Sequence, residues 1–380
     1  MGVKDTSGPP SVHVPPDTHG LPDTHGLPTA NGPRKAPGGR KIGGPWEVLC
    51  RTERWPLSRP FRISRGTKVA ADVVVVEIHD RGRTGRGEGV PYPRYGESIE
   101  SVVVQVEQIR AALAAGMTRT ELLAALPPGA ARNAVDCALW DLEAQPWDSV
   151  PTHSAPNVVR PAPAAANTLT TAVTISLDTP DAMATAARAL TNVPVIKIKV
   201  DADNPATRIH RIREICPSSS LIVDPNESWD AEILRATAQT LHDCRVALLE
   251  QPLPAGRESD LAGVEVPVPV CADESCHTAD DLPRLEGLFQ FVNIKLDKTG
   301  GLTEALALLQ AARDRGFGIM VGCMICTSLS IAPALRIARA AQFVDLDGPW
   351  WLANDRPGGV LVQAGRLQPP APGFWGELRE

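Results

Sequence analysis

Charged side chains recur at the ends of short apolar runs in the second half of the sequence. One charged residue after such a run is common, since a chain becomes polar where it reaches the surface. Here six of eight successive runs carry charge at the same end, which indicates one shared site. The residues are Lys197, Lys199, Asp224, Glu250, Asp273, Lys295, Asp345 and Asp347.

Three of these residues are carboxylates that follow consecutive runs. Asp224, Glu250 and Asp273 would repel one another at a common point unless a cation lay between them. Oxygen ligands on a rigid scaffold suit Mg²⁺, and the absence of histidine from the set disfavours zinc. The alternative is that Asp224 and Asp273 cap the helices that follow, but the sequence Glu250-Gln251-Pro252 does not fit capping. The pattern therefore favours a magnesium site.

Three lysines accompany the carboxylates. Lys197 and Lys199 have the same parity on one strand, so both point into the same space. A lysine beside another cation and a metal has a lowered pKa and can act as a general base near neutral pH. Lys295 lies on the other side of the predicted barrel and could serve the opposite face of a substrate. The alternative for a buried lysine is a salt bridge to a carboxylate. A lysine can form that salt bridge and still act as an acid or base.

The apolar runs alternate with helical patterns from residue 168 onwards. The runs occupy residues 171–177, 195–200, 221–225, 247–252, 270–275, 291–296, 318–322 and 343–347. Helical patterns begin near residues 181, 205, 228, 278, 302 and 328, and a short Pro-rich helical stretch follows the fourth run. This alternation predicts an α/β parallel (β/α)₈ barrel, whose active sites lie at the carboxyl ends of the strands. An open doubly wound sheet would usually carry a glycine fingerprint after its first strand, and none is present.

Four regions are predicted along the chain. Residues 1–45 are rich in Pro and Gly and contain the repeat PDTHGLPDTHGLP, so we expect a disordered tail with His19 and His25 solvated rather than bound to metal. We expect an α+β capping domain at residues 46–167, the barrel at residues 168–350, and a segment that returns to the capping domain at residues 351–380.

Within the capping domain we expect strands at 46–50 and 68–80 and a Gly-rich turn at 82–89. We expect helices at 97–115, 119–125 and 130–144, and a connector at 145–167.

Composition restricts the class of protein. The net charge of −6 disfavours a nucleic-acid partner or an anionic membrane surface. No apolar run is long enough to span a bilayer. The N-terminus lacks the charged-then-apolar order of a secretion signal, so we expect a cytoplasmic protein. Cys323 and Cys326 form a C-x-x-C, which could belong to a zinc site or a redox pair, but no second pair stands at a matching spacing and buried thiols are favoured.

Five ordered motifs resemble those of the muconate-lactonizing subgroup of the enolase superfamily. They are KIK at 197–199, DPN at 224–226, EQP at 250–252, ADES at 272–275 and NIKLDKTGG at 293–301. The resemblance runs from about residue 46 to residue 367 and includes GRGEGVPYPRYGES at 85–98 and ARNAVDCALWDLEA at 131–144. It implies that the magnesium ligands are Asp224, Glu250 and Asp273.

The resemblance also implies roles for the lysines. Lys199 is expected to be the base on one face of the substrate, with Lys197 tuning it, and Lys295 the acid or base on the other face. Lys298 is a nearby alternative, but its parity differs from that of Lys295. The substrate carboxylate would bind magnesium, which stabilises the enediolate formed when the α-proton leaves.

The eighth run resembles the D-x-D motif of the dipeptide epimerases, where two acids hold the free ammonium group of the substrate. Asp345 and Asp347 share parity and can both face the site. The resemblance therefore implies a magnesium-dependent isomerase that epimerises a dipeptide. The alternatives within the subgroup are a cycloisomerase and an N-acyl amino acid racemase or o-succinylbenzoate synthase. A non-catalytic ligand-binding barrel would have lost a lysine or a metal ligand, and none is missing.

The remaining substrate contacts follow from the same resemblance. Met324 and Cys326 lie in the segment GCMICTSLS, which is close to the epimerase pattern, although Cys326 stands where that family usually has glutamate. The pocket is therefore expected to lack one polar contact. Arg62 and Arg94 would meet a second substrate carboxylate, with solvated surface arginines as the alternative. Barrels of this subgroup often assemble, so we expect a homo-oligomer.

Overall fold

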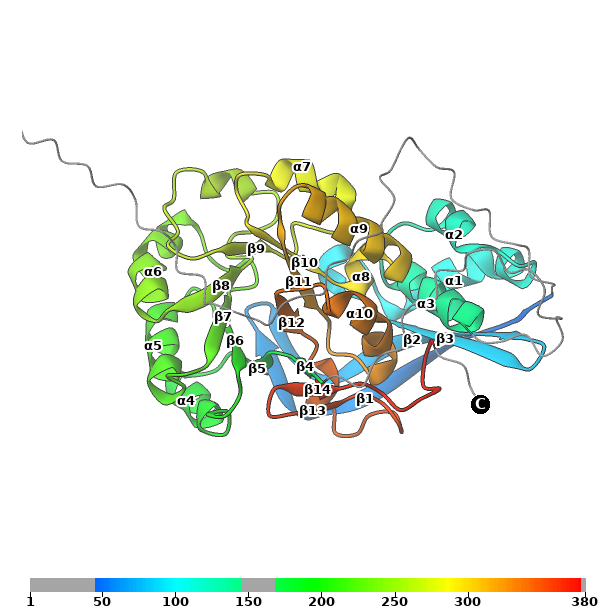
Figure 1. The fold of residues 1–380 in the computed structure, drawn as a ribbon, viewed down its shortest axis with the longest axis horizontal. Coiled ribbons are helices and arrows are strands. Elements are labelled where there is room, and N and C mark those ends of the chain that lie inside the picture. Colours follow the sequence, from blue (N-terminus) through cyan, green and yellow to red (C-terminus); the bar gives the residue numbers. More distant parts are fainter. Residues whose placement is uncertain (1–44, 145–167, 377–380) are drawn as a thin grey trace, which may run out of the picture. The chain divides into compact units, whose positions relative to one another are not determined.

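The computed structural model describes residues 45–144 and 168–376. The predicted tail, up to residue 44, and the predicted connector lie outside these residues. The described chain forms an eight-stranded parallel sheet, an N-terminal three-stranded antiparallel sheet and a small three-stranded sheet near the C-terminus (Figure 1). No helix among the described residues is long and apolar enough to cross a membrane.

The eight-stranded sheet closes into the predicted barrel. Its strands are hydrogen-bonded in sequence order from β5 to β12, and the two ends meet where Ala172 N donates to Val344 O over 2.7 Å. The strands are β5 Val173–Ile175, β6 Val195–Lys199, β7 Ser220–Asp224, β8 Val246–Glu250, β9 Val270–Ala272, β10 Phe291–Ile294, β11 Gly318–Gly322 and β12 Phe343–Asp345. The prediction of a (β/α)₈ barrel is confirmed.

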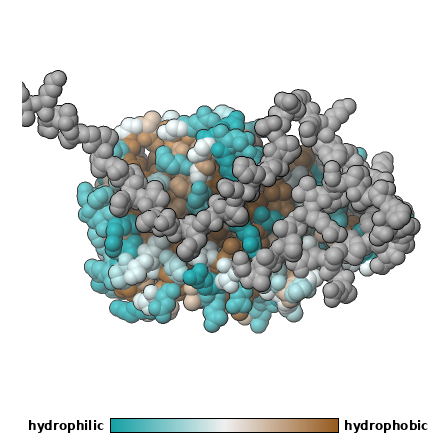
Figure 2. Space-filling view, viewed as in Figure 1, coloured by the Kyte–Doolittle hydropathy of each residue, from teal (hydrophilic) through white to brown (hydrophobic). Residues whose placement is uncertain are grey.

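Helices follow most of the strands, and their starts are set by proline or by capping side chains. Pro180 and Pro205 occupy the first turns of α4 and α5, where proline's fixed φ suits the helix and its missing N–H costs nothing. Figure 1 shows α4, α5 and α6 along the outer side of the sheet, and Figure 2 shows mainly hydrophilic residues on the surface of that region. The bounds are α4 Pro180–Arg188, α5 Pro205–Ile215, α6 Ala231–Asp243, η2 Glu258–Leu261, η3 Ala279–Asp281, α7 Leu282–Leu285, α8 Leu296–Thr299, α9 Leu302–Asp314, α10 Ser328–Ala338 and η4 Gly348–Trp351.

Among the helices that follow the barrel strands, α6 and α8 differ from the prediction. The helix expected from residue 228 begins at Ala231, because the Asp230 carboxylate accepts hydrogen bonds from Glu232 N and Ile233 N and caps it there. The short helix α8 directly after β10 was not predicted. It is only one turn long, so no hydrophobic period marks it in the sequence.

A small apolar layer fills the barrel below the charged residues. Ile222, Leu248 and Cys271 are fully buried and form a cluster with Ala172 and Met320. Ile222, Leu248 and Cys271 each lie two positions before a charged residue, namely Asp224, Glu250 and Asp273. Side chains two positions apart point to the same face of a strand, so the apolar and the charged side chain of each pair face the barrel interior. The apolar layer closes the interior and leaves the charged side chains at the mouth.

The N-terminal sheet contains β1 Glu47–Ile63, β2 Gly66–Asp80 and β3 Arg83–Gly89. The predicted Gly-rich turn at 82–89 is wrong: the turn is confined to Arg81 and Gly82, both with positive φ, and the rest is strand β3. A Cβ at Gly85, Gly87 or Gly89 would collide with backbone carbonyls of the helix that lies on this strand. The glycines therefore serve close packing.

The rest of the capping domain, after strand β3, is helical. Its helices are η1 Pro93–Tyr95, α1 Ile99–Ala114, α2 Arg119–Ala125 and α3 Ala130–Ala144, of which α3 packs on β3. Ser98 and Thr118 begin α1 and α2 with reciprocal side-chain to backbone hydrogen bonds. The predicted start of the first helix at residue 97 is thus two residues early.

The C-terminal segment contacts the capping domain. Strand β14 Arg366–Gln368 pairs with β13 Leu361–Gln363 on one side and with β4 Leu169–Thr170, just before the barrel, on the other. Ala353 N donates to Pro56 O over 2.9 Å, and Trp375 Nε1 donates to Arg86 O over 2.9 Å. These contacts connect the end of the described chain to β1 and β3.

Candidate active site

Eight of the twelve predicted site residues line one cavity of about 450 Å³ at the carboxyl ends of the barrel strands, whereas Asp224, Glu250, Arg62 and Cys326 are not part of its lining. Lys197 and Lys199 both line it from β6, which agrees with their shared parity. Lys295, just after β10, lines it from a strand four positions further around the barrel. The other predicted residues in the wall are Arg94, Asp273, Met324, Asp345 and Asp347. Capping-domain residues from the β1–β2 turn and from η1 also line the cavity.

Ion pairs connect the lysines and carboxylates in this mouth. Lys197 Nζ lies 3.1 Å from Asp224 Oδ2, 2.7 Å from Glu250 Oε2 and 2.7 Å from Asp345 Oδ2. Lys199 Nζ donates to Asp224 Oδ2 over 2.5 Å. Asp224 and Glu250 have no exposed surface, so these charges interact in a medium of low dielectric constant.

Burial and ion pairing shift the pKa values of three groups in this mouth. Burial acts to lower the pKa of Lys197, but its ion-paired carboxylates outweigh burial and hold that pKa well above its ordinary value. Burial also acts to lower the pKa of Lys295, but the neighbouring Asp273 carboxylate outweighs burial, so the pKa of Lys295 is raised as well. Burial and repulsion from Asp224 raise the pKa of Glu250 to about 7.

The oxygen atoms of this mouth fit a hard cation. Among the described residues no three acidic, histidine or cysteine side chains are gathered in the geometry of a metal site. However, Asn226 Oδ1 is buried without a hydrogen-bond partner, and Glu250 Oε2 and Asp273 Oδ1 meet only lysine ammonium groups at 2.7 Å, without an aligned hydrogen bond. Three buried carboxylates on the adjacent strands β7, β8 and β9 supply only oxygen donors. That donor set fits Mg²⁺ better than zinc.

Helix capping does not explain the two aspartates. The helix after β7 is capped by Asp230, while Asp224 Oδ1 accepts from Asn226 N over 2.9 Å in the loop between them. Thr278 provides the capping box for η3, the helical turn that follows Asp273. The capping alternative is therefore wrong for Asp224 and Asp273.

Lys295 and Lys298 occupy different surroundings. Lys295 Nζ donates to Asp273 Oδ2 over 2.6 Å and lines the cavity. Lys298 is fully buried, donates to Asn293 O over 2.8 Å and to Asp273 O, and is absent from the cavity wall. Only Lys295 is placed to reach a substrate in this cavity.

The two acids after β12 differ in their contacts. Asp345 Oδ2 accepts from Lys197, whereas Asp345 Oδ1 is buried without a hydrogen-bond partner. Asp347 Oδ2 accepts from Thr174 N over 2.7 Å. Burial, followed by repulsion from Asp345, raises the pKa of Asp347 to about 6. Two adjacent buried acids with spare acceptor capacity form a suitable place for a substrate cation.

The segment after β11 contributes its first residues to the wall. Cys323, Met324 and Ile325 line the cavity, but Cys326 is fully buried and is not part of the lining. The contact predicted for Cys326 with substrate is therefore not found. Burial and hydrogen bonding to the Cys323 thiol raise the pKa of Cys326 well above its ordinary value, so it behaves as a packed, protonated thiol.

The arginines predicted to meet a second substrate carboxylate are not free. The Arg62 side chain is exposed and does not line the cavity. Arg94 lines the cavity, but its Nε and Nη2 atoms donate to the two carboxylate oxygens of Glu227 over 2.7 and 2.8 Å. Neither residue presents an unpaired cation to the cavity.

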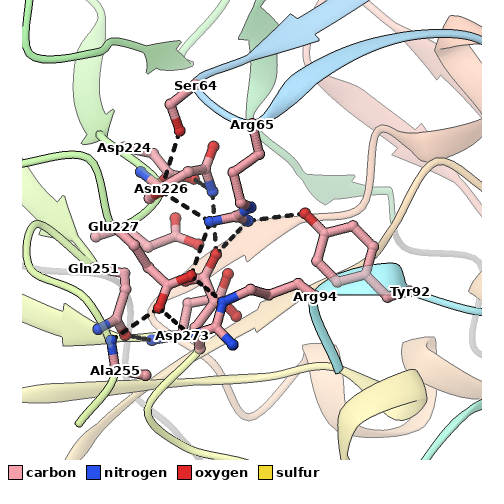
Figure 3. A network of polar contacts seen from close by, with 12 residues as sticks. Ser64, Arg65, Tyr92, Arg94, Asp224, Asn226, Glu227, Gln251, Ala255 and Asp273 are labelled. Atoms are coloured by element: carbon pink, nitrogen blue, oxygen red, sulfur yellow. Dashed lines mark hydrogen bonds and ion pairs between the residues drawn. The ribbon is translucent and has the colours of Figure 1, made fainter. Parts of the chain in front are cut away.

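A polar network around Glu227 joins the capping domain to the barrel loops (Figure 3). Arg65, from the turn between β1 and β2, donates to Glu227 over 3.0 Å, to Tyr92 over 2.8 Å and to Glu274 over 2.7 Å. Glu227 also accepts from Ala255 N over 2.8 Å and has φ of +68°, a region that non-glycine residues rarely adopt. The sequence analysis missed Arg65 and Glu227, since ion pairing across 162 residues leaves no local pattern.

This network predicts a measurable role for Glu227 in holding the capping loops over the cavity. Glu227→Gln removes the charge that two arginines share, so we expect KM to rise roughly 10-fold while kcat changes less. Trypsin should also cleave faster at the loop that carries Arg65. The matched control is Glu232→Gln, an exposed carboxylate on α6. Unchanged KM and unchanged cleavage in Glu227→Gln would contradict this role.

Comparisons with known proteins agree with this geometry. The family described as mandelate racemase / muconate lactonizing enzyme, N-terminal domain, matches residues 46–150, and the family described as enolase C-terminal domain-like matches residues 181–380. The L-Ala-D/L-Glu epimerase of Escherichia coli is 48% identical over 317 residues, which cover 83% of this chain and 97% of that protein. An N-acetyl-D-glutamate racemase from a Pseudoalteromonas species is 42% identical over 306 residues, covering 80% and 95% of the two chains.

Solved structures of similar proteins contain dipeptides and metal ions. An enolase family member from Agrobacterium tumefaciens, with bound sodium and L-Ala-L-Glu, has a TM-score of 0.80 and 44% identity, covering 87% of this chain and 100% of that one. The dipeptide epimerase of Methylococcus capsulatus, complexed with Mg and L-Arg-D-Lys, has a TM-score of 0.75 and 32% identity, covering 87% and 98%.

Proposed function

The chain belongs to the mandelate racemase / muconate lactonizing enzyme family of enolase-like proteins, and on this premise we propose that it is a magnesium-dependent dipeptide epimerase. The observation that carries the proposal is the placement of Lys199 and Lys295 on strands four positions apart in one eight-stranded barrel, facing a shared cavity. Two bases on opposite sides of one carbon are what inversion of its configuration requires.

The lysines divide the proton transfer between them. One lysine, in its neutral form, removes the α-proton next to the substrate carboxylate, and the other, as an ammonium, delivers a proton to the opposite face. The reverse reaction exchanges the two roles. Lys197 lies among three carboxylates, where its positive charge reduces their repulsion and favours a negatively charged substrate group nearby.

Asp224, Glu250 and Asp273 are the residues proposed to hold the magnesium ion. When bound, the ion supplies a Lewis acid that stabilises the charge developing on the substrate carboxylate as the α-proton leaves. Their burial on three adjacent strands and their oxygen-only donor set support this assignment. Dipeptide epimerases of Cytophaga hutchinsonii and Methylococcus capsulatus that resemble this chain have been solved with Mg bound.

Asp345 and Asp347 support a dipeptide as the substrate. A dipeptide carries a free ammonium group, and two buried acids in the cavity wall can neutralise it. The second candidate is racemisation of an N-acylated amino acid, which the similarity to the N-acetyl-D-glutamate racemase favours. An N-acyl group has no ammonium, so the two substrates differ at these aspartates.

Proton NMR in deuterated water with magnesium tests the proposal directly. With L-Ala-L-Glu, we expect the glutamyl α-proton signal to disappear and the signals of the diastereomer to appear. The same experiment with N-acetyl-L-glutamate provides the comparison. Exchange in the N-acetyl compound alone would favour the second candidate. The absence of α-proton exchange across a library of dipeptides would reject dipeptide epimerisation.

Asp347→Asn separates the two candidate substrates. The amide cannot neutralise an ammonium group, so we expect KM for the dipeptide to rise roughly 10- to 100-fold while KM for N-acetylglutamate stays the same. For the unmodified enzyme, KM for the dipeptide should rise as the pH falls through about 6, where Asp347 becomes protonated and loses its charge. Equal KM changes for both substrates would contradict a specific ammonium contact.

The proposal retains two expectations from the sequence. They are a homo-oligomeric assembly and a cytoplasmic location. Light scattering of the purified full chain measures the first, and fractionation of the source cells measures the second.

A further inference from the structure

Strand β1 leaves its partner β2 over residues 57–60, where the register between the two strands shifts. Within this bulge Leu57 forms an antiparallel bridge with Leu352. The neighbouring Ser58 Oγ donates to Trp351 O over 3.1 Å. A bulge re-aims the side chains of a strand, and here it turns β1 towards η4 and the acids that precede η4.

Arg59 lies within this bulge and stacks on two tryptophans of η4. Its guanidinium carbon lies 4.0 Å from the centre of the Trp350 ring and 4.3 Å from the centre of the Trp351 ring. The two indole rings stand at 88° to each other. A guanidinium group is attracted to the face of an aromatic ring, so Arg59 holds both indoles against β1.

Trp351 carries this contact to the barrel mouth. Its side chain is buried, and its Nε1 donates to Asp347 Oδ2 over 3.4 Å. The same oxygen accepts from Thr174 N over 2.7 Å. The Phe61 ring packs edge to face on Trp351, with 4.6 Å between the ring centres. A donor aimed at a buried carboxylate fixes the direction of that group and favours its charged form.

Asp347 needs such support, because its surroundings oppose its charge. Burial and repulsion from Asp345 raise the pKa of Asp347, and hydrogen bonds from Thr174 and the charge of Lys197 oppose that rise. The Asp347 carboxylate in turn opposes the lowering of the Arg59 pKa by burial. Within the described part of the chain, the charged groups that face Asp347 are Asp345 from β12, Lys197 from β6 and Arg59 from β1.

Arg59, Trp350 and Trp351 are not part of the cavity lining. They do not meet a substrate there, so their effect on a substrate must pass through Asp347, which does line the cavity.

We propose that Arg59 and Trp351 are positioning residues that hold the Asp347 carboxylate charged and directed at the ammonium group of the substrate. The capping domain thereby takes part in recognising the free amino end of a dipeptide. This inference rests on the proposed epimerase function and adds two residues to its specificity.

The test compares L-Ala-L-Glu with N-propionyl-L-glutamate, which has the same skeleton without the ammonium group. Trp351→Phe keeps an aromatic ring and removes the Nε1 donor. It should raise KM for L-Ala-L-Glu roughly 10-fold and leave Ki for N-propionyl-L-glutamate within about twofold. Arg59→Gln should raise the same KM about threefold, and Arg59→Lys should recover most of that loss. In each variant kcat should change less than KM.

The pH dependence of Trp351→Phe separates positioning from packing. Loss of the donor disfavours the charged form of Asp347. As the pH falls, KM for L-Ala-L-Glu should therefore begin to rise about 0.5 pH unit higher than in the unmodified enzyme. A role limited to packing would lower the melting temperature and leave this profile unmoved. Asp345 and Lys197 are present in all of these variants.

The matched control is Arg119→Gln. It removes another guanidinium that stacks on a tryptophan, 3.8 Å from the centre of the Trp140 ring, and neither residue lines the cavity. This variant should leave KM and Ki unchanged. Circular dichroism checks the fold of each variant, and the exposed position of Arg59 keeps Arg59→Gln informative if the buried substitution at Trp351 unfolds the protein.

Two results would overturn the role of Arg59 and Trp351. One is an unchanged KM for L-Ala-L-Glu in the folded variants, and the other is an equal rise in KM and in Ki for N-propionyl-L-glutamate. The absence of α-proton exchange with every dipeptide in the unmodified enzyme would instead reject the epimerase function.

Discussion

Replacing Lys199 or Lys295 by alanine is expected to reduce the rate of epimerisation by about 10³- to 10⁴-fold or more. Each variant loses the only acid or base on one face of the α-carbon, and general acid–base catalysis alone contributes about 10²- to 10⁴-fold. Both variants should still fold, since Asp224 keeps Lys197 at 3.1 Å and Asp273 keeps Lys298 at 2.7 Å. The measurement is the rate of diastereomer formation by NMR.

The two variants should also differ from each other in deuterated water. Lys199→Ala retains Lys295, and Lys295→Ala retains Lys199, so each variant can still remove the proton from one face. We therefore expect each one to exchange the α-proton of only one diastereomer, and the two variants to choose opposite diastereomers. Exchange of both diastereomers by either variant, or normal epimerisation, would contradict the two-lysine mechanism.

Removing divalent cations is expected to have the second large effect. Chelation should abolish turnover, and added Mg²⁺ should restore it, because the oxygen donors at the barrel mouth suit that ion. Glu250→Gln should weaken Mg²⁺ binding at least about 100-fold in titration calorimetry, since changes to outer-shell partners already cost about 10- to 100-fold. Glu250 has no exposed surface and lies between Asp224 and Asp273 in strand order, so its charge is central to the set.

A matched control keeps this prediction specific. Glu232→Gln removes an exposed carboxylate on α6 and should leave the Mg²⁺ affinity unchanged. Full activity in excess chelator would show that the carboxylates serve only as partners of the lysines. In that case Glu250→Gln would change the stability of the protein and not its metal affinity.

The barrel and the charged mouth could be predicted from the sequence because both follow from local patterns. Eight apolar runs separated by helices leave few alternatives to a parallel barrel. Side chains alternate along a strand, so Lys197 and Lys199 had to face one space. The carboxyl ends of parallel strands lie at one edge, so Asp224, Glu250 and Asp273 had to approach one another.

Other features depended on contacts between segments that are distant in the sequence. Residues 82–89 have the composition of a turn, but the helix Ala130–Ala144 packs so closely on them that strand β3 needs its glycines. Arg94 has the chemistry to bind a substrate carboxylate, but Glu227 already occupies it from a barrel loop.

One physical reason explains why some features could be predicted from the sequence and others only from the tertiary structure. Strand parity and strand order are properties of the backbone, and the hydrophobic period of the sequence records them. Whether a charged side chain is neutralised or free depends on which oppositely charged residue lies within about 4 Å in space, whatever its distance along the chain. The sequence by itself therefore determined the barrel and the positions of its lysines and carboxylates, and the tertiary structure decided which cations remain available to a substrate.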